Sequence, residues 1–336
     1  MRVKTLLTCL AILCAAYALL CLQLPTPEQP TPIYNQRVPA WAKSLNQYNR
    51  METGGFQLMT YRFIDYTGKK KTLGFSISTA EHQKLSRRFG YNQQSVEKRV
   101  LARLDKGIAD IISRAGLSQY LNYSLTGRSL SFQPATVPGA VHAKVLETLN
   151  KANSFFSKNY LPFFNQELRT RGFYIDGNYI KIDYNTLIEW NTEPLRGCFN
   201  SLYATGKGYT LAQYLGLFIA FLQEIHYELP PNNVKGTFTG GIYIPTDVLI
   251  NNRGDCDSKS IVFCALWRHF KDARLIIVLL HEHALIGVGI TPGPGQKSVR
   301  LGNTHYVLCE VAGPGKLYPG YVDPSTKGTF TYYMVK

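Results

Sequence analysis

The sequence predicts an α+β protein, and three kinds of pattern support this fold class. Residues 56–64 and 72–78 are rich in β-forming side chains and flank a turn with glycine, which indicates a hairpin. Residues 95–112 repeat apolar side chains every three or four positions, as an amphipathic helix does. Later stretches have the pattern of strands, at residues 274–281, 283–290 and 305–311.

Length and composition limit the class of protein. The chain has 336 residues, of which 45% are hydrophobic and 18% are charged. These values suit a globular body with a sizeable core, and they exclude a disordered polymer, a collagen and a transporter with many spans. The length predicts about two domains.

The net charge of +15 is uneven along the chain. Residues 1–150 carry +11 and residues 151–336 carry +4. Such an excess of positive charge permits binding to nucleic acid, anionic lipid or an acidic polymer. The densest basic spots, residues 69–71 and 87–88, come without any nucleic-acid-binding motif. We therefore expect no nucleic-acid partner.

The amino terminus predicts export. Arg2 and Lys4 precede an apolar run over residues 6–24, which is typical of a signal peptide. The run is also close to the roughly 20 residues that span a bilayer. A cleaved signal peptide and an uncleaved membrane anchor both remain open, and both place the body across the membrane. We expect a periplasmic or membrane-anchored protein facing the exterior, with a proline-rich tether after the apolar run.

The remaining elements follow from similar patterns. We expect strand at residues 120–132, a helix over 141–164 that ends near Pro162, a hairpin over 173–182, and helices over 211–227 and from Cys256 to about residue 269. The predicted organisation is a signal or anchor at 1–24, a linker at 25–50, an amino-terminal α+β domain at 51–170 and a catalytic domain at 171–336.

Cys256 is the candidate nucleophile among the seven cysteines. It follows Gly254 and Asp255, at the start of a helix whose apolar residues indicate burial. Asp255 can cap that helix. The helix dipole favours the thiolate at this place, whereas the flanking carboxylates oppose it. A basic partner is therefore needed.

His283 is the best candidate for that base. It stands at the start of an apolar strand. Glu310 ends the next predicted strand, and antiparallel pairing can bring it beside the imidazole, whose tautomer it would fix. His281 is an alternative base, because a spacing of two residues puts it on the same strand face.

An ordered set of motifs resembles the transglutaminase-like superfamily, the papain-related group with a Cys-His-acid site. Over about residues 173–325 it comprises FLQEIHY at 221–227, PTDVL at 245–249, GDCDSKS at 254–260, HA at 283–284, YVLCE at 306–310 and GPG at 313–315.

The resemblance implies a papain-like core, in which a helix with the nucleophile packs on an antiparallel sheet with base and acid. It implies thiolate attack on an amide or ester carbonyl, followed by hydrolysis or transamidation, without a cofactor. Many members have Asp as the acid, which leaves Asp323 as an alternative to Glu310. Gln223 is a candidate hydrogen-bond donor to the oxyanion. In the alternative interpretation, its side chain binds the backbone of a loop. The substrate would be a protein or peptide, and a peptidoglycan-linked amide is compatible with the location.

Two other interpretations stay open. The chain can be a catalytically silent module that holds a peptide in the same cleft. A zinc site can also be imagined from His281, His283, His305 and Cys309, but no second close pair accompanies the first two histidines. We therefore predict no metal.

Overall fold

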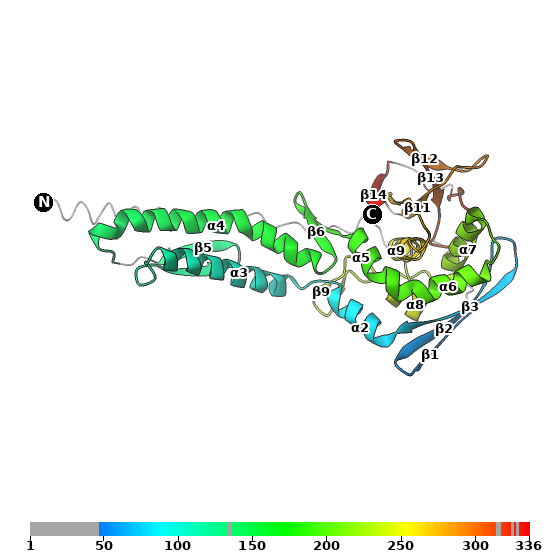
Figure 1. The fold of residues 1–336 in the computed structure, drawn as a ribbon, viewed down its shortest axis with the longest axis horizontal. Coiled ribbons are helices and arrows are strands. Elements are labelled where there is room, and N and C mark those ends of the chain that lie inside the picture. The colour runs from blue at the N-terminus through cyan, green and yellow to red at the C-terminus, as the bar shows by residue number, and fades with distance from the viewer. Residues whose placement is uncertain (1–46, 134–135, 282, 314–316, 324–325, 327–328) are drawn as a thin grey trace. The chain divides into compact units, whose positions relative to one another are not determined.

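The computed structural model describes residues 47–336 except 134–135, 282, 314–316, 324–325 and 327–328. Helices and antiparallel strands are both abundant (Figure 1), which confirms the α+β class. Within these residues no helix combines the length and the apolar character needed to cross a bilayer. The predicted signal or anchor segment lies outside the described part of the chain.

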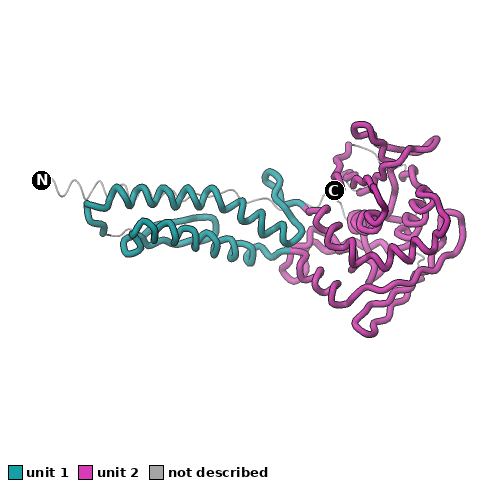
Figure 2. Tube along the Cα trace, viewed as in Figure 1, with its two compact units in different colours: residues 1–29, 91–181 teal, residues 30–90, 182–336 magenta. Residues whose placement is uncertain are grey.

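The chain divides into two compact units (Figure 2). The described part of the first is residues 91–181, and that of the second is residues 47–90 together with 182–336. This division does not coincide with the predicted boundary near residue 170. The physical reason is the three-stranded sheet of residues 47–78, whose apolar face packs on helices of the second unit.

Two long helices form most of the first unit, α3 (Gln93–Arg114) and α4 (His142–Arg169). They lie side by side, and Gly107 leaves room for the Phe155 ring, since a Cβ there would lie 2.3 Å from it. The remaining strands pair as hairpins: β4 (Asn122–Thr126) with β5 (Ser129–Gln133), and β6 (Phe173–Asp176) with β7 (Tyr179–Ile182).

The prediction that the second helix ends near Pro162 is wrong. Helix α4 contains Pro162 and continues to Arg169. A proline inside a helix removes one backbone donor and costs about 3 kcal/mol. Phe164 and Leu168, which follow it, are buried at 1% and 0% exposure, and burial of such side chains returns about 1.5–3 kcal/mol each.

The described part of the second unit contains two sheets of three or more strands. The first has the order β1-β2-β3 and includes the predicted hairpin, with β1 (Gln47–Thr53), β2 (Phe56–Ile64) and β3 (Lys70–Ser78). The second is antiparallel with the order β12-β13-β11-β10-β14. Its strands are β10 (Leu275–Leu279), β11 (Ala284–Gly289), β12 (Ser298–Leu301), β13 (Thr304–Cys309) and β14 (Thr331–Val335).

Helix α9 (Cys256–Trp267) is the centre of the second unit, because all twelve of its residues are buried. The second half of the helix, residues 261–267, is apolar on every side, and such a helix must be enclosed. Strand β11, the middle strand of the larger sheet, packs on α9, and so do four helices: α5 (Tyr184–Thr192), α6 (Arg196–Thr205), α7 (Leu211–Glu224) and α8 (Pro245–Asn251). The other elements are α2 (Thr79–Arg88), β8 (Asn233–Val234), β9 (Thr237–Phe238), and the short 3-10 turns Gly139–Val141 and Glu193–Leu195.

Candidate active site

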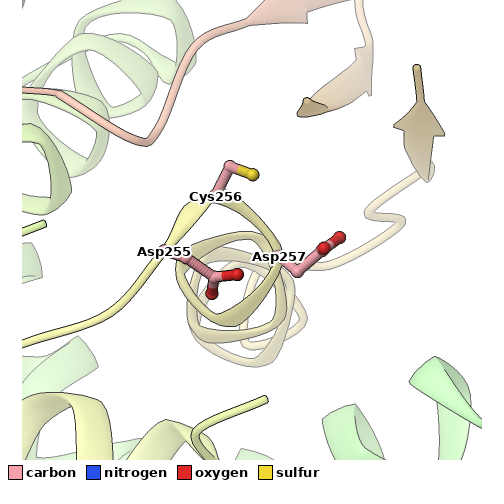
Figure 3. Close-up of side chains that lie close together, drawn as sticks. All are labelled: Asp255, Cys256 and Asp257. Atoms are coloured by element: carbon pink, nitrogen blue, oxygen red, sulfur yellow. The ribbon is translucent and has the colours of Figure 1, made fainter. Parts of the chain in front are cut away.

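Cys256 is the first residue of α9, and only 2% of it is exposed. Asp255 caps the helix, since its Oδ1 accepts the Ser258 backbone N–H at 2.9 Å. Figure 3 shows Asp255, Cys256 and Asp257 at this first turn, with the sulfur pointing away from the helix. The predicted capping role of Asp255 is therefore confirmed.

The segment before Cys256 is fixed by several contacts. The Gly254 N–H donates to the His226 carbonyl at 3.0 Å. The Arg253 guanidinium donates to Glu228 at 2.7 Å and lies 4.5 Å from the centre of the Tyr243 ring. Tyr243 donates its hydroxyl to the same Glu228 oxygen at 2.7 Å. The turn before Cys256 is thus fixed by a backbone hydrogen bond to His226 and by the contact of Arg253 with Glu228.

His283 and Glu310 come together as the sequence predicts. Strands β11 and β13 are antiparallel neighbours, with Ile286 opposite Cys309. Continued by one pair, this register sets Glu310, just after β13, opposite Leu285, so that His283, two residues before Leu285, is its diagonal neighbour on the same face. The His283 Nε2 is hydrogen-bonded to Glu310 Oε2. Glu310 Oε1 accepts the Ala312 backbone N–H at 2.8 Å, so both carboxylate oxygens have partners.

The cysteine lies against the same two strands. Cys256 packs in a small apolar cluster with Tyr227, Ala284 and Ala312. Ala284 directly follows His283, and its backbone N–H faces the Cys256 sulfur. The fold therefore gathers the helix start with the nucleophile candidate, the strand with the base candidate and the strand with the acid candidate.

The electrostatics of the thiol oppose its ionisation in this closed conformation. Burial raises the pKa of Cys256 well above its ordinary value, and Asp257 and Asp255 raise it further. The Ala284 N–H acts in the opposite direction. The expectation that the helix start favours the thiolate is thus outweighed here by burial and by the neighbouring carboxylates.

The pKa of the base candidate is also raised. Burial lowers the pKa of His283, but Glu310, then Asp257 and Asp323, raise it, and the net shift is upward. Glu310 provides the ring hydrogen bond, and Asp323 contributes the smallest of these effects. Of the two candidate acids, Glu310 is thus in contact with the imidazole.

The two acids beside the cysteine are also perturbed. Burial raises the pKa of Asp257 to about 8, with a further contribution from Asp255. Burial raises the pKa of Asp255 to about 6, against its hydrogen bond with Ser258. Tyr184 donates its hydroxyl to Asp257 at 3.2 Å. Asp257 is therefore a buried acid that is hydrogen-bonded to Tyr184.

Gln223 does not present a donor for an oxyanion in this conformation. Its Nε2 donates to the Glu310 carbonyl at 2.8 Å and to the Leu317 carbonyl at 3.0 Å, which uses both amide hydrogens. Gln223 therefore binds backbone carbonyls, as the alternative interpretation predicts. Gln223 also lines a cavity of about 280 Å³, together with Asp65, Tyr66 and Tyr318.

The histidines and cysteine of the zinc alternative do not gather. Among the described residues, the group of three candidate ligands whose atoms lie within 4.8 Å of one another is Asp255, Cys256 and Asp257. His281 is exposed, and Cys309 is buried with its sulfur directed to the Val307 carbonyl at 3.6 Å. The four cysteines of the described residues are free.

Lys259 is a site residue that the sequence reasoning missed. It lies three positions after Cys256, and its side chain is completely buried. Burial lowers the pKa of Lys259 to about 7, whereas Glu310, Asp255 and Cys256 raise it. The sequence offers one signal for it, a lysine in a helix whose apolar run over residues 261–267 predicts burial, where a charged residue needs a specific partner.

Comparisons with protein-family models, with curated proteins and with solved structures find no significant match to this chain.

Proposed function

We propose that the chain is a cysteine-dependent acyl-transfer enzyme that acts on amide bonds, with Cys256 as nucleophile, His283 as base and Glu310 as orienting acid. The observation that carries the proposal is the hydrogen bond between His283 and Glu310. His283 directly precedes Ala284, which packs on Cys256. A thiol, an imidazole and a carboxylate in this order form the arrangement needed for nucleophilic catalysis. The resemblance to transglutaminase-like enzymes points to the same chemistry.

The reaction begins with a proton transfer. Because Glu310 binds the Nε2 of His283, the proposed base is Nδ1, which takes the proton from the Cys256 sulfur. The thiolate forms a bond to the amide carbon, and the carbonyl oxygen becomes an oxyanion. When this intermediate collapses, the carbon–nitrogen bond breaks and His283 gives its proton to the leaving amine. A thioester on Cys256 remains.

The second half of the reaction regenerates the thiol. Water or a second amine attacks the thioester carbon and passes a proton to His283, which returns it to the departing sulfur. Water gives hydrolysis, as in a protease or amidase, and an amine gives transamidation. The backbone N–H groups at the start of α9 are the proposed oxyanion donors, since a helix start directs unsatisfied donors toward an anion.

Access to the thiol is part of the proposal. Cys256 is 2% exposed, and Leu229 and Leu279 pack against its cluster. A substrate carbonyl reaches the sulfur only if some of these side chains move. Substrate binding that opens the cluster would also remove part of the burial that raises the pKa of Cys256.

The compartment and the substrate follow from the amino-terminal segment. We infer an exported protein of the cell envelope, held by the membrane if the segment stays uncleaved, which acts on a protein or peptide, including a peptidoglycan-linked amide. This inference rests on residues 1–24 and on the chemistry of the site.

A second candidate function is a catalytically silent module that binds a peptide in the same cleft. The enclosed thiol favours it, because a buried Cys256 with a raised pKa is a weak nucleophile as it stands. Both candidates predict peptide binding, and only the enzyme predicts a reactive thiol.

Peptide-resolved alkylation by iodoacetamide separates the two functions. For the enzyme we expect Cys256 to react near neutral pH at least tenfold faster than Cys264, a matched cysteine in the same helix with 0% exposure. We expect His283→Ala to remove most of this difference. Equal rates for the two cysteines, unchanged by His283→Ala, would contradict the enzyme and favour the silent module. Trapping of an acyl group as a hydroxamate by hydroxylamine then identifies the thioester.

A further inference from the structure

The Lys259 side chain connects three parts of the candidate site. Its Nζ donates to the Ile225 carbonyl at 2.6 Å and to the Ala312 carbonyl at 2.5 Å. Ile225 caps the end of α7, and Ala312 is two residues after Glu310. The Nζ also lies 5.8 Å from the centre of the Tyr227 ring. One side chain thus fixes the end of α7 and the acid strand to the helix of Cys256.

The charge of Lys259 is unusual for its place. Among the described residues it is the one basic side chain that is buried, and the same interior holds Asp255, Asp257 and Glu310. A buried ammonium persists only beside negative charge and hydrogen-bond acceptors. The pKa of Lys259 is raised by three neighbours, Glu310, Asp255 and Cys256, which favour its protonated form.

We propose that Lys259 is a positioning residue of the thiol site, whose ammonium holds the acid strand in place and supplies the positive charge that the Cys256 thiolate faces. The inference rests on the proposed function, because the thiolate matters only if Cys256 reacts. It adds a fourth residue to the three that the motifs indicate.

The need for this charge follows from the surroundings of the sulfur. The acidic side chains next to the sulfur disfavour the thiolate when they are ionised, which Asp257 is mainly above about pH 8, and a cation at the same place offsets part of that repulsion. His283 supplies one positive charge after it takes the proton, and the protonated fraction of Lys259, whose pKa is about 7, supplies a second before the transfer. The titratable groups that act on the sulfur are Tyr227, Asp255, Asp257, Lys259 and Glu310, and His283 faces Glu310 and Asp257.

The pH profile of Cys256 alkylation in the full chain tests the proposal. Lys259→Met replaces the ammonium by an uncharged chain of similar length. We expect the midpoint of the profile to rise by about one pH unit or more, which slows the reaction about tenfold at neutral pH. The matched control is Ser260→Ala, which removes another buried polar group of α9 that has no hydrogen-bond partner and no charge. We expect its profile to equal that of the unmodified chain.

A second variant separates charge from hydrogen bonding. Lys259→Gln keeps amide donors for the two carbonyls but has no charge, so we expect it to shift the profile as Lys259→Met does. A folded Lys259→Met or Lys259→Gln protein with an unchanged Cys256 midpoint would overturn the proposal. Loss of the cooperative melt in both variants, while Ser260→Ala melts normally, would make Lys259 a residue of the fold alone and contradict it as well.

The outcomes keep the two proposals apart. A Cys256 that reacts quickly in the unmodified chain and equally quickly in Lys259→Met leaves the proposed function in place and removes the role of Lys259. A Cys256 that reacts no faster than Cys264 in the unmodified chain overturns the proposed function, and the role of Lys259 with it.

Discussion

Glu310 and His283 differ in how much water each contacts, and this difference assigns their roles. The Glu310 side chain is 1% exposed, whereas the His283 ring keeps 18% of its surface exposed. The carboxylate therefore lies behind the imidazole and orients it. Because the pKa of His283 is higher in the folded chain, the pair stabilises the fold while His283 is protonated. That contribution is lost as the pH rises through the folded pKa.

Replacing each candidate acid distinguishes their effects on His283. Glu310→Gln removes a negative charge in contact with the ring, so we expect the pKa of His283 to fall by about one unit or more. Asp323→Asn removes a weaker influence, so we expect a smaller fall. NMR titration of the His283 ring measures both, with the exposed His281 as an internal reference. A larger fall in Asp323→Asn would assign the acid role to Asp323.

At the scale of elements, the acid strand depends on a close approach to α7. Gly313 has φ +54°, and a Cβ built on it would lie 2.0 Å from the Gln223 carbonyl oxygen. Gln223 in turn donates to the Glu310 and Leu317 carbonyls. The strand is thus fixed on one side by the Gln223 amide and on the other by Lys259 on Ala312. Both contacts act on the backbone that carries Glu310.

Gly313→Ala tests this close approach. The left-handed backbone costs about 1–2 kcal/mol and the steric overlap about 1–3 kcal/mol, so we expect a loss of about 2–5 kcal/mol in the free energy of unfolding. We also expect slower alkylation of Cys256, because Glu310 moves with its backbone. The control is Gly302→Ala, with φ +57° and no atom within 4 Å of its Cβ, which carries the backbone cost alone. Equal losses in both variants, measured by urea unfolding, would argue against the contact.

The sequence predicts elements well where the evidence for them is local. The hairpin of β2 and β3, helix α3 and strands β10, β11 and β13 follow from periodicity and turn residues, and the pairing of His283 with Glu310 follows from strand order. Contacts between distant segments were not accessible in this way. The two carbonyls that hold Lys259 come from residues 34 and 53 positions away. No local pattern indicates that they meet at one buried amine.

At the scale of the whole molecule, the second unit is assembled from two distant stretches of sequence (Figure 2). Strand β2 contributes Tyr61, whose ring meets the Phe221 ring edge-on at 5.1 Å and whose hydroxyl donates to the Leu249 carbonyl. Phe63 contacts the same Phe221 ring at 5.7 Å. Helix α7 therefore needs the amino-terminal sheet to cover one of its faces. A boundary drawn near residue 170 from changes in composition separates these partners.

A chain that begins at residue 171 should consequently not fold into an active unit. Without β2 and β3 it loses six buried apolar side chains and exposes the surfaces that they pack against: Met59, Tyr61, Phe63, Leu73, Phe75 and Ile77. Burial of such side chains contributes about 1.5–3 kcal/mol each, and the total is comparable to the 5–15 kcal/mol by which domains are stable. We expect no cooperative thermal melt and no preferential alkylation of Cys256. The matched control begins at residue 47 and keeps the sheet, so it should melt cooperatively. The contrary result is a shorter chain that melts cooperatively and whose Cys256 reacts as fast as in the control. In that case residues 171–336 are an independent domain, and neither its folding nor the reactivity of Cys256 requires the sheet of β1, β2 and β3.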